Sequence, residues 1–117
     1  MATLRFSVPA RSDLSEITIV LAQESPKRAR AFRLRLMERC GALKNVPLAG
    51  RPRPEIGIDV RSLSVRPIVV FYRVRENRNA VEILRSIDGR RDLRTIFPED
   101  VRRRPDHLQR IVEFIVV

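Results

Sequence analysis

The chain has 117 residues, of which 44% are hydrophobic, and this composition fits one domain with a modest core. Its formal net charge is +10, and because only Lys27 and Lys44 are lysines, 22 of the 24 basic residues are arginines. The excess of basic over acidic residues predicts an acidic partner, such as nucleic acid, an acidic protein segment or an anionic surface. The plainer alternative is a basic surface that is only solvated. The single cysteine, Cys40, excludes an intrachain disulfide and a multi-cysteine metal site, and no apolar run reaches the ~18–20 residues of a membrane span, so we expect a cytoplasmic protein without metal or cofactor.

The first predicted element is a short strand, in which Leu4, Phe6 and Val8 alternate with polar residues until Pro9 ends it. A helix is predicted next, over residues 12–24, because apolar residues there recur at helical spacing.

This first helix begins at Ser12 or Pro9, and Asp13 and Glu16 favour its positive end. Ile19 falls nearly opposite the apolar face. A lone exposed isoleucine is common, but it also suits a contact with a partner chain.

Ser25-Pro26 predicts the start of a second helix, with serine as the N-cap and proline in the first turn, and this helix runs to about Lys44. Cys40 lies on its apolar stripe, so we interpret it as a small core residue rather than a nucleophile. Two helices joined by so short a break are predicted to pack antiparallel as a hairpin.

A loop rich in proline and glycine follows over residues 48–57, and its stiff backbone is expected to project Arg51 and Arg53 outward. Three apolar runs then predict an antiparallel meander of strands, over residues 60–65, 68–74 and 80–87.

The meander is predicted to carry a positive surface. No acidic residue stands between Asp59 and Glu76, whereas Arg61 and Arg73 are among four arginines in that interval. In the last strand, Arg85 alternates with apolar residues on one face, so it needs an acidic partner, either an acidic segment or a neighbour such as a glutamate.

The charged corner at residues 88–92 closes the meander, and Pro98 marks the end of the predicted domain, residues 1–97. The remainder, residues 98–117, is basic and amphipathic at its end. We expect a partly helical extension that docks on the domain or dimerises.

This order predicts an α+β fold, β-α-α-β-β-β, with a helical hairpin packed on a mainly antiparallel sheet and a C-terminal helical tail. Four segments carry a resemblance to a known family: FSVPARSDLSEI, GRPRPEIG, IVVFYRV and VEILRSIDGRRDL. They resemble the RelE/ParE superfamily of type II toxin–antitoxin toxins, and most closely its ParE branch.

The strand motif YxIFYR of ParE-like chains is matched by Phe71, Tyr72 and Arg73. The family's xIxRVLHxxRD corner is matched by five residues: Ile83, Arg85, Gly89, Arg91 and Asp92. Asp88 stands where the family often has histidine, which removes a titratable group from the corner.

The resemblance implies a small growth-inhibiting toxin, with a role in plasmid maintenance, that is neutralised by an antitoxin encoded beside it. The acidic C-terminal segment of the antitoxin is expected to wrap the toxin across its helices and sheet, in a heterotetramer or around a toxin homodimer. ParE-type toxins act on DNA gyrase, whereas RelE-type toxins cut mRNA at the ribosome.

A metal-independent RNase needs a base, a cation for the phosphate and an acid. Tyr72 is the only tyrosine and His107, in the tail, the only histidine, so the sequence favours a gyrase inhibitor that works by binding over the RelE-like alternative. Tyr72 is interpreted as a core residue, and Asp92 as an ion-pair partner of Arg91 or Arg85.

A basic nucleic-acid-binding module is the third alternative, but no helix-turn-helix or stacking pattern supports it. The residues predicted to bind antitoxin or target are all arginines: Arg51, Arg53, Arg61, Arg73, Arg85, Arg90 and Arg91.

Overall fold

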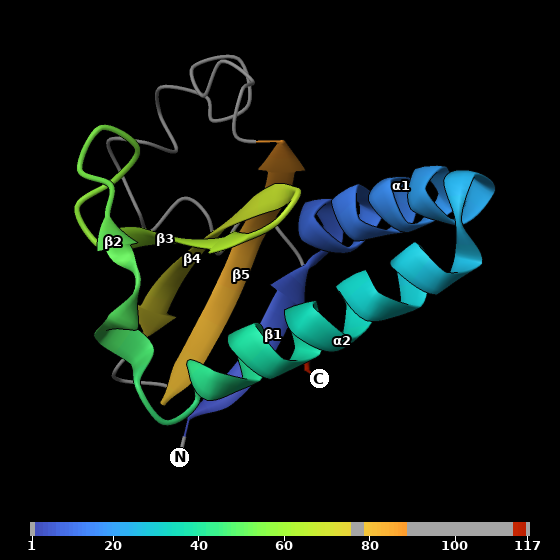
Figure 1. The fold of residues 1–117 in the computed structure, drawn as a ribbon. Helices are drawn as coiled ribbons and strands as arrows, with labels where there is room; N and C mark the ends of the chain where they lie inside the picture. Colours follow the sequence, from blue (N-terminus) through green and yellow to red (C-terminus); the bar gives the residue numbers. More distant parts are fainter. Residues whose placement is uncertain (1, 76–78, 89–113, 117) are drawn as a thin grey trace.

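A computed structural model describes residues 2–75, 79–88 and 114–116 of the chain. Two α-helices and one short 3-10 helix, η1, are interspersed with six strands (Figure 1). The elements in chain order are β1 (Thr3–Ser7), α1 (Val8–Glu24), α2 (Pro26–Ala42), η1 (Pro47–Ala49), β2 (Arg51–Pro52), β3 (Val60–Val65), β4 (Ile68–Arg75), β5 (Ala80–Asp88) and β6 (Phe114–Val116).

The strands form one sheet in the order β2-β3-β4-β5-β1-β6. β1 runs parallel to β5, and all other neighbours are antiparallel. The hairpin of α1 and α2 lies against this sheet (Figure 1). The structure therefore confirms the predicted α+β fold, with a helical hairpin on a mainly antiparallel sheet.

Of the two predicted starts of α1, the structure agrees with Pro9 to within one residue and excludes Ser12. Val8 is the first helical residue rather than the last strand residue, and the helix begins ahead of Ser12. Ser7 is the N-cap, and its side chain accepts a hydrogen bond from the backbone N–H of Ala10 at 3.1 Å. Pro9 lies in the first turn, where its missing N–H leaves no bond unmade, so it begins this helix instead of only ending the strand.

The predicted start of α2 is confirmed. Ser25 caps the helix by accepting a hydrogen bond from the backbone N–H of Arg28 at 3.2 Å, and Pro26 occupies the first turn. The helix ends at Ala42, slightly before the expected end at Lys44. The single residue between the helices forces the chain to reverse, as predicted for a hairpin.

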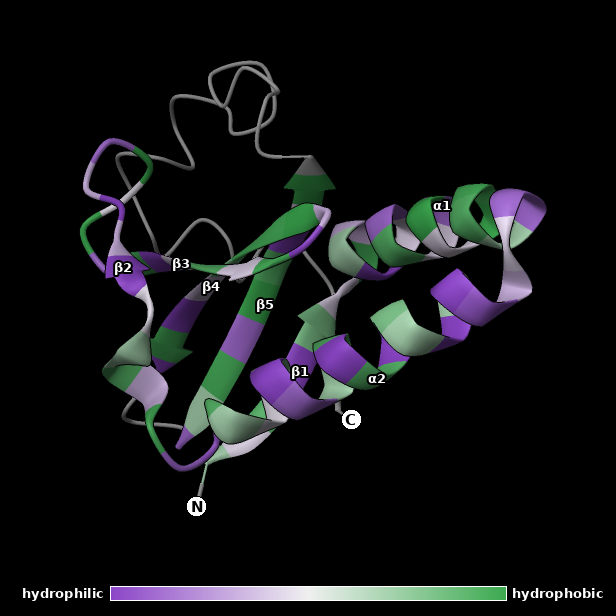
Figure 2. Cartoon of the chain, in the orientation of Figure 1, coloured by the Kyte–Doolittle hydropathy of each residue, from purple (hydrophilic) through white to green (hydrophobic). Residues whose placement is uncertain are grey.

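The core lies between the hairpin and the facing side of the sheet. α2 contributes Phe32, Leu36 and Cys40, which pack against buried side chains of the sheet such as Phe6 and Ile83. In Figure 2, hydrophobic residues predominate along β5, in the middle of the sheet, whereas hydrophilic residues recur along α2, which is exposed on its outer side.

Cys40 is 1% exposed, and burial raises the pKa of its thiol to about 12, against a weaker opposing effect of Arg39. Its predicted core role is confirmed.

A β-bulge interrupts the pairing of β4 with β5 between Phe71 and Tyr72. Phe71 pairs with Arg85 and Tyr72 with Ile83, so Leu84 has no residue opposite it. Such an extra residue bends the strand locally and re-aims the side chains around it.

Near the C-terminus, Phe114–Val116 forms β6, which pairs with β1, so these residues are a strand and not part of the expected helix. The rest of the predicted tail helix, up to residue 113, lies outside the described residues, as do the corner residues 89–92. Within the described ranges, neither helix is long and apolar enough to cross a membrane.

Candidate functional site

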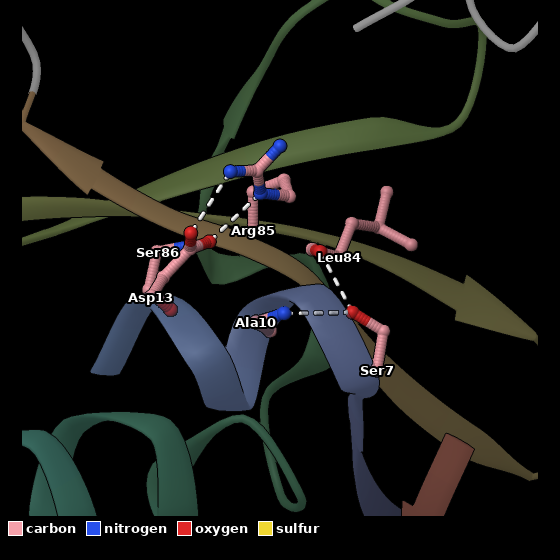
Figure 3. A network of polar contacts seen from close by, with 6 residues as sticks. All are labelled: Ser7, Ala10, Asp13, Leu84, Arg85 and Ser86. Atoms are coloured by element: carbon pink, nitrogen blue, oxygen red, sulfur yellow. Dashed lines mark hydrogen bonds and ion pairs between the residues drawn. The ribbon is translucent and has the colours of Figure 1, made fainter. Parts of the chain in front are cut away.

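The N-terminal part of α1 is fastened to β5 by a network of polar contacts (Figure 3). The Ser7 hydroxyl donates to the carbonyl oxygen of Leu84 at 2.8 Å. Further along α1, both carboxylate oxygens of Asp13 accept hydrogen bonds from Arg85, from Nε and Nη2, each at 2.8 Å. The backbone N–H of Ser86 donates to the same carboxylate at 2.9 Å. Asp13 thus takes three donors from one stretch of β5.

This network supplies the acidic partner that the sequence required for Arg85. Within the described residues this partner is Asp13 of α1, and not a glutamate neighbour in the sheet. The predicted alternative, Asp92, lies outside the described residues. The hydrogen bonds to Asp13 raise the pKa of the Arg85 guanidinium above its ordinary value, burial opposes the rise, and the charges of Asp13 and Glu16 add to it. Arg85 therefore fixes the helix to the sheet through two of its five N–H donors, one on Nε and one on Nη2.

Arg73, which was predicted to lie on an open positive face, is only 1% exposed. Its Nη2 lies 2.7 Å from Oδ2 of Asp59, and its neighbour across the β4–β5 pair is the fully buried Glu82. Burial lowers the pKa of the Arg73 guanidinium, and so does the charge of Arg75, whereas Asp59 and Glu82 oppose the shift. The position of Arg73 is that of a buried structural cation.

Arg61 and Arg53 hold the loop that leads from α2 into the sheet. Nη1 of Arg61 donates to the carbonyl oxygens of Gly50 at 2.8 Å and Leu48 at 3.2 Å. Arg53 donates from Nε to the Ser62 hydroxyl at 2.8 Å, and its guanidinium lies 5.7 Å from the centre of the Phe71 ring. Both side chains remain partly exposed, so each can support the loop and still offer charge to a partner.

Tyr72, on β4, binds the same loop to the sheet through two hydrogen bonds of its hydroxyl. Its hydroxyl accepts a hydrogen bond from the backbone N–H of Gly50 and donates one to the carbonyl oxygen of Pro47, both at 2.8 Å. The side chain is fully buried, and this burial raises the pKa of the phenol, against the effects of the Gly50 N–H and of Arg61. The predicted core role of Tyr72 is confirmed.

The predicted arginines therefore do not share one face. Arg51, Arg53 and Arg61 come together on β2 and β3 and the loop between them, where Arg51 is exposed. Arg73 is buried on β4, and Arg85 is bound to α1. The two remaining predicted positions, Arg90 and Arg91, lie outside the described residues.

The hairpin itself carries a surface that the arginine-based prediction missed. A groove of about 670 Å³ runs between α1 and α2, above Phe6. Ile19 and Met37, on opposite walls, are 56% and 58% exposed, and Arg11 and Arg33 also line the groove. The position of Ile19 opposite the apolar face was the one signal in the sequence. We call this surface the hairpin groove.

The residues of the described ranges include no group of three His, Cys, Asp or Glu side chains that could hold a metal ion. What they offer is charge, an apolar groove and a rigid support. These are properties of a surface that binds another macromolecule.

Comparisons with known proteins agree with the fold described above. The family model described as "ParE toxin of type II toxin-antitoxin system, parDE" matches residues 4–93. A solved structure described as "Chromosomal ParDE TA system from P. aeruginosa" superimposes with a TM-score of 0.62 at 25% sequence identity, covering 75% of this chain and 96% of the other. None of the proteins with curated functional descriptions matches by sequence.

Proposed function

The chain belongs to the ParE toxin family of type II toxin–antitoxin systems, and from this membership we propose that it is a cytoplasmic toxin that binds and inhibits DNA gyrase until an antitoxin encoded beside it neutralises it. The observation that carries the proposal is the match over residues 4–93, which spans β1 to β5 and both helices. The geometry adds the hairpin groove and the basic segment of residues 48–61, with Arg51, Arg53 and Arg61, through which such a protein can bind partners.

The hairpin groove is the proposed docking surface for the antitoxin. Its exposed Ile19 and Met37 suit the apolar face of an amphipathic segment, and Arg11 and Arg33 suit acidic residues beside that face. Burying these apolar side chains on binding stabilises the complex, and the arginines favour an acidic partner over a basic one.

The state of Tyr72 supports inhibition by binding over mRNA cleavage. An acid or base must reach the proton that it transfers, but the Tyr72 hydroxyl is buried and already has one donor and one acceptor in the loop. Burial also raises the pKa of the phenol, so this tyrosine is a poor base near neutral pH. These facts weigh against Tyr72 in the catalytic role that a RelE-like nuclease would need.

A gyrase assay tests the target. The purified chain, added to gyrase, ATP and plasmid DNA, is expected to block supercoiling or to accumulate cleaved DNA complexes, and addition of the antitoxin should reverse the effect. Normal supercoiling at all toxin concentrations would count against gyrase. Translation-dependent cuts in cellular mRNA after expression would instead establish the RelE-like alternative.

The docking surface is tested with the double variant Ile19→Glu/Met37→Glu. Because both substitutions place charge in the groove, antitoxin affinity should fall by about a hundredfold or more. Leu34→Glu is the matched control, since Leu34 is 72% exposed on α2 and does not line the groove. Equal affinities of the two variants would exclude the groove as the antitoxin site.

Among the arginines predicted from the sequence, we propose that Arg51, Arg53 and Arg61 contribute charge to partner binding. Arg51 gives the cleanest test, because it is exposed and its side chain forms no hydrogen bond or ion pair within the described part of the chain. Arg51→Glu should weaken binding of an acidic partner more at low salt than at high salt. An affinity that is unchanged at low salt would remove Arg51 from the interface.

A further inference from the structure

A second pocket lies on the other side of α2 from the hairpin groove. It has a volume of about 340 Å³ and is bounded by the last turns of α1, by α2 and by the turn between β3 and β4. Leu21, Phe32 and Pro67 provide its apolar lining. Three guanidinium groups surround that lining, from Arg28, Arg35 and Arg66, and we call the site the arginine pocket.

The charge of this pocket is uncompensated. None of its lining residues is acidic, and within the described part of the chain none of the three arginines forms an ion pair. This differs from Arg73 and Arg85, each of which is held by an aspartate. Like charges brought together at a cavity without a counter-charge favour binding of an anion.

The pocket is also held in shape. Nη2 of Arg35 donates to the backbone carbonyl oxygen of Arg66 at 2.9 Å, which joins α2 to the β3–β4 turn. A guanidinium has five N–H donors, so Arg35 keeps others for a ligand while it makes this contact. Phe32, at the base of the pocket, is 1% exposed and belongs to the hydrophobic core, so the lining rests on a rigid element.

We propose that the arginine pocket binds an acidic segment of a protein partner, with one apolar side chain seated in the pocket and flanking carboxylates bound by Arg28, Arg35 and Arg66. The apolar lining favours this ligand over nucleic acid, because a phosphate backbone needs the charges but has nothing to place against Leu21 and Pro67. A base could stack only on an accessible aromatic face, and the Phe32 ring is buried. The inference stands on the pocket itself and does not depend on the proposed gyrase target.

The arginine pocket and the hairpin groove are separate sites. Their linings have no residue in common. Arg33 faces the groove and Arg35 the pocket, and two residues along a helix turn the side chain by about 200°. A protein partner could therefore occupy the pocket while another segment fills the groove.

The test uses the full chain and a fluorescent peptide with one leucine flanked on both sides by glutamates. Binding measured by fluorescence anisotropy should fall about tenfold in Arg28→Gln/Arg66→Gln. It should fall by less than about twofold in the control Arg30→Gln/Arg39→Gln, which removes the same charge from exposed positions of α2 outside the pocket. Arg35 is kept in both, so its contact with Arg66 is retained.

Two further probes decide the chemistry. A peptide with glycine in place of leucine should bind more weakly to the unaltered chain, because it leaves the apolar lining empty. A single-stranded oligonucleotide of equal charge should bind with an affinity that the two double variants change equally. Equal peptide losses in both double variants would overturn the proposal, and so would oligonucleotide binding that depends on Arg28 and Arg66 alone.

Discussion

Asp13 and Arg85 form a two-pronged ion pair between α1 and β5, across 72 residues of sequence, with both hydrogen bonds at 2.8 Å. The side chains retain only 11% and 24% of their exposure, so the pair is partly desolvated and poorly screened. A third bond, from the backbone N–H of Ser86, reaches the same carboxylate. Through Asp13, the helix that forms one wall of the hairpin groove is fixed to the sheet.

We expect Asp13→Asn to lower the free energy of unfolding by about 2 kcal/mol, because it removes the charge from three hydrogen bonds and takes the bound carboxylate away from Arg85. Arg85→Gln should have a similar effect. The double variant should lose less than the sum of the two, with a coupling of about 1–2 kcal/mol. Urea unfolding, followed by circular dichroism, measures the free energy of unfolding of the two single variants and of the double variant.

Glu16→Gln is the control for this cycle, since the charge of Glu16 acts on Arg85 without a hydrogen bond to it. Its effect should stay within about 0.5 kcal/mol. Strict additivity of Asp13→Asn and Arg85→Gln would show that the two side chains do not interact in solution.

Arg73 and Arg51 were predicted to share a binding function, but their different burial predicts that substitution of Arg73 lowers stability far more than substitution of Arg51. Arg73→Gln removes a cation that is 1% exposed, breaks its 2.7 Å contact with Asp59 and weakens the positive charge near the buried Glu82, which Arg75 still approaches at 3.8 Å. We therefore expect a loss of about 3 kcal/mol in stability. Arg51→Gln, at an exposed position of β2, should change stability by less than about 0.5 kcal/mol. Thermal unfolding of the two variants under identical conditions makes the comparison, and similar melting temperatures would contradict the structural role of Arg73.

Much of the fold could be predicted because local signals agreed with one another. Ser25-Pro26 marked the break between the helices, and the apolar runs from Val60 to Ile87 marked the strands. The start of α1 stayed open between Ser12 and Pro9 in the sequence, because Pro9 can both end a strand and begin a helix. Only the bond between Ser7 and the backbone of Ala10 decides between these roles.

The candidate site was less predictable, since long-range pairing determines which arginines stay available. Nothing near Arg85 in sequence identifies Asp13 as its partner, and nothing near Arg73 shows that it is buried beside Asp59. The hairpin groove depends on how closely α1 and α2 pack, which the sequence does not determine. The only indication of it in the sequence was the position of Ile19 opposite the apolar face of its helix. The arginine pocket joins α2 to a turn that lies 31 residues beyond Arg35.

Cys40 should be protected from thiol reagents in the folded protein. Burial raises its pKa from 9.0 to about 12, so at pH 8.5 the folded chain holds almost no thiolate, and the sulfur is also inaccessible. We expect iodoacetamide to label the chain fully in urea and very slowly without it. Rapid labelling of the folded chain would contradict the burial of Cys40.

The same shift predicts how stability depends on pH. Because the folded pKa lies above the unfolded value, the stabilisation from the neutral thiol is complete below about pH 9 and is lost as the pH rises toward 12. The unfolding free energy of the unaltered chain should therefore fall faster above pH 9 than that of Cys40→Ala, which lacks the group. Parallel curves would mean that the thiol ionises equally in both states.

Two glycines give a matched pair in which the same substitution has opposite consequences. A Cβ at Gly50 would lie 2.5 Å from the Tyr72 hydroxyl oxygen and 2.7 Å from the carbonyl oxygen of Ser62, so Gly50→Ala must displace the loop from Tyr72. We expect a loss of about 1–3 kcal/mol. Gly41 lies in α2, and apart from its chain neighbours and the adjacent backbone of its own helix no atom lies within 4 Å of such a Cβ, so Gly41→Ala should stabilise the chain by about 0.5–1 kcal/mol.

Urea unfolding of the two alanine variants provides the measurement, and Tyr72→Phe identifies the cause at Gly50. If the clash with Tyr72 is what destabilises Gly50→Ala, then combining it with Tyr72→Phe, which removes the hydroxyl, should add less than the separate effects. A Gly50→Ala variant as stable as the unaltered chain would mean that the loop does not rest on Tyr72.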